Sequence, residues 1–385
     1  MSAPDLALPI GARLLHVGPY KTGTTALQAA LKHGREELAR QGVWVPERGN
    51  VVEEPRGAIT ADPADPARAE WLRLVERVEE AGDRRAVVSS EYLSDADPEA
   101  AARIIGELGG DRVHIVITLR PLVKILPSSW SQLSRHRGNP PYEEWLRSTL
   151  EGDGSNAPNP MFWHRQRHGE LVERWAAAAG GPEGVTVIVV DESDKDRLRH
   201  GFEDLLGLTR GTLEFRSSNE NRSFTAGEAE FIRQCWEAIA AAGIPHDISR
   251  KYFKRGAIAH MKSTRRPERH EPRITTPKWA QERASELSVE AVEHIRRSGV
   301  RVLGDLNALH GPAPFEPEPQ DSAVAPAAAA LAMVRVLQIA RDDERARKRA
   351  ASKAALRRQP AVDQVPTAEL LRVVGRRVRR RLTGR

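Results

Sequence analysis

The chain has 385 residues, a formal net charge of +6 and a single cysteine, Cys235. This length exceeds one typical domain, and a lone cysteine excludes both an intrachain disulfide and a thiolate metal cluster. No run reaches the roughly 18 apolar residues of a membrane span, and residues 1–9 lack the pattern of a secretory signal. We therefore expect a cytoplasmic protein.

The positive charge is concentrated towards the C-terminus. Residues 312–385 contain 16 Lys/Arg and 8 Asp/Glu, a surplus of eight, which leaves residues 1–311 with a net charge of −2. The basic character of the whole chain therefore says little about the ligand of its N-terminal part.

A short apolar run at residues 14–17 precedes a loop, residues 18–28, with the composition of a phosphate site. A strand, a loop of small residues and a helix direct several backbone N–H groups at one point, which suits an oxyanion. Lys21 adds a cation, and in nucleoside-triphosphate loops this lysine follows the second glycine, whereas Lys21 precedes Gly23. An ordinary ATP or GTP site is therefore disfavoured. The alternative is a helix N-terminus with a chance lysine. Hydroxyl donors for a bound phosphate are Thr22, Thr24 and Thr25.

Further along the chain, apolar segments alternate with helical patterns. Patterns typical of buried strands lie at residues 43–45, 85–89, 113–119 and 185–190, and patterns typical of helices at residues 98–108, 162–179 and 195–206. This alternation predicts an α/β fold with a P-loop-type parallel sheet flanked by helices. Ligands of such sheets bind beyond the carboxyl ends of the strands. Three segments at predicted strand ends should therefore meet in one crevice: residues 18–25, 89–91 and 120–128.

The remainder of the chain contains two further helical patterns, at residues 224–242 and 278–298, and a basic, loop-like stretch at residues 251–273. Proline, alanine and glutamate then dominate, as in a linker. We predict three parts: an α/β domain of residues 1–311, a linker of residues 312–326, and a basic Ala/Arg-rich tail of residues 327–385 that is helical or disordered.

The end of the tail has the pattern of a basic amphipathic helix. After Pro366, one helical face collects Leu371, Val374, Val378 and Leu382 amid six arginines. This pattern predicts contact with a membrane surface or another anionic partner. The membrane surface would be the inner face of the membrane, and we expect no specific nucleic acid as a partner. A solvated or frayed tail is the alternative, since Gly375 interrupts the pattern.

The loop and a second motif together resemble the sulfotransferases that use 3′-phosphoadenosine 5′-phosphosulfate (PAPS). The segment Lys21-Thr22-Gly23-Thr24-Thr25 resembles that family's loop for the 5′-phosphosulfate, in which the lysine stands before the glycine. Residues 120–128 resemble its 3′-phosphate motif, in which Arg120 and Ser128 grip the phosphate. Residues 219–223 resemble a segment that closes the nucleotide site, with Arg222 as a phosphate contact. The resemblance covers residues 12–310 and leaves out the tail.

The resemblance implies transfer of the sulfuryl group of PAPS to a hydroxyl of a carbohydrate, glycolipid or small natural product, with no metal. Lys21 would stabilise the leaving phosphate, which the loop amides of Gly23, Thr24 and Thr25 would hold. Family members have a histidine or a glutamate as general base after an early strand, and this chain has Glu91 there. The alternative for Glu91 is a helix-capping or salt-bridged carboxylate.

Other side chains are weaker candidates. His136, His164 and His168 could contact an acceptor, with surface residues as the alternative. Trp44, Trp130 and Trp163 could stack on adenine or on a sugar, with core or rim packing as the alternative. Two other functions stay open. One is an atypical P-loop kinase, for which Mg²⁺ ligands are not evident. The other is a scaffold that binds membrane or nucleic acid through the basic tail.

Overall fold

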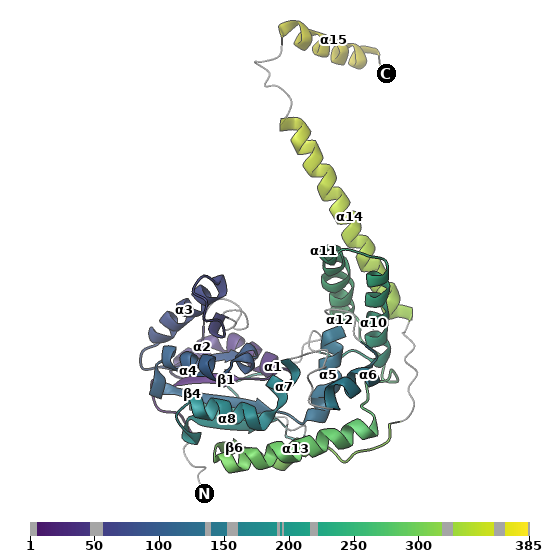
Figure 1. Ribbon diagram of the computed structural model, residues 1–385. Helices are drawn as coiled ribbons and strands as arrows, with labels where there is room; N and C mark the ends of the chain where they lie inside the picture. Colours follow the sequence, from purple (N-terminus) through teal and green to yellow (C-terminus); the bar gives the residue numbers. More distant parts are fainter. Residues whose placement is uncertain are drawn as a thin grey trace. The chain divides into compact units, whose positions relative to one another are not determined.

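The computed structural model describes residues 6–46, 57–134, 140–151, 161–190, 193–194, 196–215, 222–317, 326–357 and 366–383. The chain separates into two compact units (Figure 1). The first unit comprises residues 1–243 and 262–325, and the second comprises residues 244–261 and 326–385. The predicted phosphate loop belongs to the first unit.

The first unit is built on a six-stranded sheet in the order β2-β3-β1-β4-β5-β6. Every neighbouring pair of strands is parallel. The α/β fold with a parallel sheet, predicted from the alternation of apolar segments, is therefore confirmed. The strands are β1 (Arg13–Val17), β2 (Val43–Trp44), β3 (Arg85–Ser90), β4 (Val113–Leu119), β5 (Val185–Val189) and β6 (Arg301–Leu303).

Helices cover both faces of this sheet because alternate strand residues are apolar on each side. One core packs strand residues such as Leu15 and Ile117 against α3 (Pro66–Glu79), α4 (Pro98–Glu107), α8 (His168–Ala178) and α13 (Lys278–Ser298). The other packs residues such as Leu14 and Val116 against α1 (Thr24–His33), α2 (Arg35–Arg40) and α9 (Arg197–Leu206). The sheet is thus the middle layer of three.

Four more helices of this unit are α5 (Leu122–Ser134), α6 (Tyr142–Leu150), α7 (Met161–Gln166) and α10 (Ala226–Ala241). Short 3₁₀ turns are η2 (Tyr92–Asp95), η3 (Gly110–Arg112), η4 (Pro182–Gly184) and η7 (Leu306–His310). The single helix predicted over residues 162–179 is interrupted at Arg167, whose ψ of 80° lies outside the helical range. α7 and α8 meet at this residue.

The second unit packs α14 (Pro326–Arg357) against α11 (His246–Ser249) and the π-helix η6 (Arg250–Ile258). α12 (Ala259–Thr264) continues η6, and its residues up to Met261 belong to this unit. The loop predicted at residues 251–273 is therefore wrong up to Thr264. Buried Phe253 and Ala257 lie one turn apart among basic residues. The apolar face of this helix was therefore not recognised from the largely basic sequence. Gly256 also allows the close approach of α14, since a Cβ at this position would lie 2.5 Å from Ile339 Cδ1.

The tail contains helix α14 and a separate helix, α15 (Thr367–Thr383). Within the described ranges, no helix has the length and apolar character needed to cross a membrane. The division into domain, linker and tail stays a prediction, and residues 318–325 of the linker lie outside the described residues.

Candidate functional site

The predicted phosphate loop connects β1 to α1 through two left-handed backbone positions. Lys21 has φ 77° and is the one non-glycine residue with positive φ in the described part of the chain, and Gly23 has φ 94°. A Cβ at Gly18 would lie 2.1 Å from Thr24 Oγ1, so this turn requires glycine there. No side chain caps α1. The N–H groups of Gly23, Thr24 and Thr25 consequently have no hydrogen-bond partner among the described residues.

The loop hydroxyls differ in their surroundings. Thr22 donates to Pro19 O at 2.7 Å and Thr24 donates to Gly18 O at 3.1 Å, and both threonines are buried. Thr25 is exposed. The hydroxyls of Thr22 and Thr24 therefore brace the loop from inside.

A chain of buried hydrogen bonds fixes the loop to the sheet. His16 Nδ1 lies 2.8 Å from Ser89 Oγ, His16 Nε2 lies 3.0 Å from Thr118 Oγ1, and Thr118 Oγ1 lies 2.8 Å from Thr22 Oγ1. Burial lowers the pKa of the His16 imidazole to about 3, so the ring is neutral. Since Thr22 gives its proton to Pro19 O, Thr118 donates to Thr22, His16 Nε2–H donates to Thr118, and Ser89 donates to Nδ1.

Glu91 follows the last residue of β3, at the same edge of the sheet as the loop. Burial raises the pKa of its carboxyl group, and a backbone hydrogen bond, the charge of Lys21 and a hydrogen bond with Gln28 partly offset this effect. Glu91 Oε2 is buried without a hydrogen-bond partner among the described residues. Glu91 makes no side-chain cap hydrogen bond to η2, so the structure does not show it as a helix cap. The alternative of a salt-bridged glutamate stays open, because the charges of Lys21 and Arg165 both act on its carboxyl group. The structure thus brings Glu91 and Lys21 within electrostatic reach of each other.

The second predicted motif begins where β4 ends. Arg120 Nη1 donates to the carbonyl oxygen of Lys21 at 3.3 Å, so this arginine borders the loop. Ser128 lies on α5, where its hydroxyl donates to Ile125 O at 3.0 Å. β1, β3 and β4 are adjacent strands, and the three segments at their carboxyl ends therefore share one edge of the sheet. Their meeting in one crevice stays a prediction.

Arg222 lies in a different cluster. Its guanidinium donates to both carboxylate oxygens of the buried Glu228, at 2.7 and 2.8 Å, and Arg265 donates to the same carboxylate at 2.8 Å. These ion pairs keep the pKa of Glu228 low, against the effect of its burial. The contact of Arg222 with a phosphate stays a prediction. Residues 219–221 of its segment lie outside the described residues.

A small cavity of about 190 Å³ adjoins the loop at Tyr20. The ring of Tyr20 lies 4.4 Å from the guanidinium carbon of Arg165, which in turn pairs with Asp95, Nη2 to Oδ2 2.7 Å. Gln166 Nε2 donates to Tyr20 O at 3.4 Å. The residues that line this loop-side cavity are Tyr20, Ser129, Gln132, Leu133, Phe162, Arg165 and Gln166.

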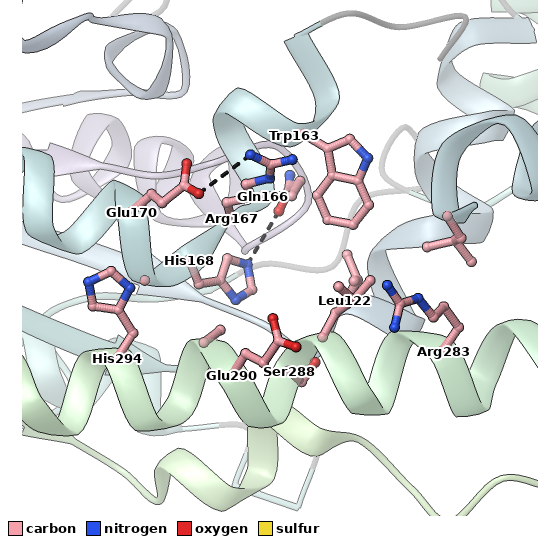
Figure 2. Close-up of a pocket in the computed structure, with 14 residues that line it drawn as sticks. Leu122, Trp163, Gln166, Arg167, His168, Glu170, Arg283, Ser288, Glu290 and His294 are labelled. Atoms are coloured by element: carbon pink, nitrogen blue, oxygen red, sulfur yellow. Dashed lines mark hydrogen bonds and ion pairs between the residues drawn. The ribbon is translucent and has the colours of Figure 1, made fainter. Parts of the chain in front are cut away.

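Among the weaker candidates, Trp130 is buried and donates through Nε1 to Pro140 O at 3.0 Å, as a core residue would. Trp163 and His168 line a second cavity, shown in Figure 2. His136 lies outside the described residues. Sequence reasoning missed His16, Gln28 and Gln166, whose partners are remote in the chain.

The edge of the sheet therefore combines unpartnered loop amides, a lysine, an arginine and a buried carboxylate of raised pKa. The amides and cations suit an oxyanion. A carboxylate shielded from water is a stronger base once it is ionised, which suits removal of a proton from a hydroxyl.

Comparisons with known proteins gave one similar solved structure. No family model matches this chain, and no curated protein does. Among solved structures, the chain is similar to a sulfotransferase from Alicyclobacillus acidocaldarius, with 19% sequence identity, coverage of 60% of this chain and 92% of that chain, and a TM-score of 0.38. Similarity at this level does not assign the chain to a family.

Proposed function

We propose that this chain is a sulfotransferase that moves the sulfuryl group of PAPS to a hydroxyl of an acceptor. The observation that carries the proposal is the electrostatic interaction of Lys21 with Glu91 beside the N–H groups of Gly23, Thr24 and Thr25, which have no hydrogen-bond partner among the described residues. A phosphate-binding loop needs the amides and the lysine, whereas a hydroxyl acceptor also needs a base.

In the proposed reaction, the carboxylate of Glu91 takes the proton of the acceptor hydroxyl as the new O–S bond forms. The bond between sulfur and the bridging oxygen of the donor breaks, and adenosine 3′,5′-bisphosphate leaves. Lys21 neutralises the charge that develops on the bridging oxygen. The amides of residues 23–25 hold the 5′-phosphate, whose position their fixed directions define.

The 3′-phosphate of the donor is assigned to Arg120 and Ser128, with Arg222 as an additional contact. Arg120 already touches the loop through Lys21 O, which supports a nucleotide that bridges the two motifs. A guanidinium with its planar set of donors suits a dianionic phosphate better than an ammonium group does.

Calorimetric titration tests this function directly. Adenosine 3′,5′-bisphosphate should bind without Mg²⁺, and Lys21→Ala should weaken that binding, while Lys32→Ala on the exposed side of α1 should not. Binding of Mg²⁺-ATP alone would instead favour the kinase, and binding of neither nucleotide would overturn both enzyme functions.

For the tail, we propose contact of α15 with the anionic inner face of the membrane. Its apolar side chains are exposed, Leu371 to 67% and Val374 to 56%, and six arginines oppose one glutamate within the helix. Exposed apolar side chains flanked by arginines suit a surface that is both apolar and anionic. This proposal concerns the second unit by itself and is independent of the enzymatic one.

A further inference from the structure

A second cavity, here called the distal cavity, lies between α13 and the junction of α7 with α8 (Figure 2). Its volume is about 330 Å³, within the size range of small-molecule sites. The side chains that define it are Trp163, Gln166, His168, Arg283 and Glu290.

Trp163 provides an aromatic wall. Its Nε1–H is already used, since it donates to Thr149 O at 2.8 Å. The side chain is half-buried, and Figure 2 shows its ring beside the cavity, near Leu122. The indole therefore offers a ligand its ring face rather than its polar edge, beside the guanidinium of Arg167, whose carbon lies 5.8 Å from the ring centroid. A ring face suits the C–H groups of an apolar or sugar-like surface.

His168 provides a neutral polar group. Only 3% of the residue is exposed, and burial lowers the pKa of its imidazole to about 4. His168 Nε2 lies 3.4 Å from Gln166 Oε1, so Nε2 carries the proton and Nδ1 is a hydrogen-bond acceptor. Nδ1 has no hydrogen-bond partner among the described residues, which leaves it for a ligand donor.

The charges around the distal cavity leave no positive surplus. Arg167 pairs with Glu170 at 3.4 Å and Arg283 pairs with Glu286 at 2.9 Å. Glu290, across the cavity from His168 in Figure 2, has no ion pair in the described part of the chain. A multiply charged anion such as a nucleotide would meet this carboxylate, whereas hydroxyl groups would donate to it.

An aromatic wall, an imidazole acceptor and a carboxylate acceptor in a cavity without excess positive charge fit a neutral sugar ring. We propose that the distal cavity binds a neutral sugar unit of the acceptor. Gln166 lines both this cavity and the loop-side cavity and contacts Tyr20, the neighbour of Lys21. The acceptor is then an oligosaccharide whose sulfated unit occupies the loop-side cavity, an assignment that rests on the sulfotransferase function proposed above.

The test is calorimetric titration of the full chain with neutral disaccharides: cellobiose, maltose, lactose and trehalose, each without nucleotide. At least one should bind. Trp163→Ala should weaken its binding at least about fivefold, through loss of the stacked ring, and Glu290→Gln about tenfold, through loss of a charged acceptor. Glu293→Gln, an exposed carboxylate on the same helix, is the matched control and should change nothing.

Trp163→Phe keeps a ring but loses the hydrogen bond to Thr149, so it separates stacking from structural support and should retain binding. The inference is overturned if no disaccharide binds, or if Glu293→Gln weakens binding as much as Glu290→Gln does. Nucleotide is absent from this titration, so the two proposals can fail separately. Binding of a disaccharide by a chain that does not bind adenosine 3′,5′-bisphosphate would refute the proposed function alone. Binding of the bisphosphate by a chain that binds no disaccharide would refute the sugar site alone.

Discussion

Arg120 donates a hydrogen bond to the backbone carbonyl oxygen of Lys21, with Nη1 and O 3.3 Å apart. The two residues are separated by 99 positions in the chain, yet β4 and β1 are neighbours and bring them together. A ligand with two phosphates some distance apart would therefore find one motif for each. This contact also fixes the carbonyl of the one non-glycine residue with positive φ among the described residues.

Replacement of the proposed base should remove most of the activity. We expect Glu91→Gln to slow sulfuryl transfer at least about 100-fold, since general-base catalysis contributes on that scale. The measurement is turnover with labelled PAPS and an acceptor found by screening. Full activity in Glu91→Gln would reject Glu91 as the base.

The same substitution should stabilise the folded chain at neutral pH. Burial raises the pKa of Glu91 above its ordinary value, so its ionised form costs stability, and that cost grows as pH rises through the folded pKa. Thermal unfolding should show a higher Tm for Glu91→Gln than for the parent at pH 7–8 and nearly equal Tm values below about pH 4, where the carboxyl is protonated in both states. A constant difference across this range would show that ionisation is not the cause.

The buried chain from Ser89 to Thr22 should matter for nucleotide affinity as well as stability. Thr118→Val leaves the His16 N–H without an acceptor, at a cost of about 1–3 kcal/mol in unfolding free energy, and frees Thr22 from the sheet. We therefore expect weaker binding of adenosine 3′,5′-bisphosphate in calorimetry.

A matched control is available in the same sheet. Thr186 Oγ1 lies 2.8 Å from His114 Nε2 in an equivalent buried pair, near the amino end of β4 and away from the loop. Thr186→Val should destabilise the fold to a similar degree but leave nucleotide affinity unchanged. Equal losses of affinity in both variants would mean that Thr118 acts only through general stability.

The basic tail gives a prediction that is independent of the enzyme site. Replacing Arg376 and Arg377 by glutamate should weaken binding to vesicles that contain anionic lipid at least about 30-fold, at about 1 kcal/mol for each basic residue near such a surface. Vesicles of uncharged lipid are the control. Binding of the parent chain to both kinds of vesicle alike would contradict an electrostatic contact.

Sequence patterns predicted the sheet well because its strands are short apolar runs, and residues 113–119 and 278–298 match β4 and α13. The position of Glu91 also followed, since a strand end can be read from where the apolar run stops. The partners of His16 could not be predicted, because Ser89 and Thr118 lie 73 and 102 residues away and leave no periodic signal. The helical segment that contains Gly256 and packs against α14 was also not predicted, because basic residues surround its few apolar ones.

The central claim is that two motifs bind two phosphates of one nucleotide, the loop at Lys21 and the arginine at Arg120. Calorimetry with adenosine 3′,5′-bisphosphate and with adenosine 5′-monophosphate, which lacks the 3′-phosphate, tests it most directly. We predict that Arg120→Ala weakens binding of the bisphosphate about 10- to 100-fold and leaves that of the monophosphate nearly unchanged. Equal weakening of both nucleotides, or no binding of the bisphosphate by the parent chain, would contradict the claim.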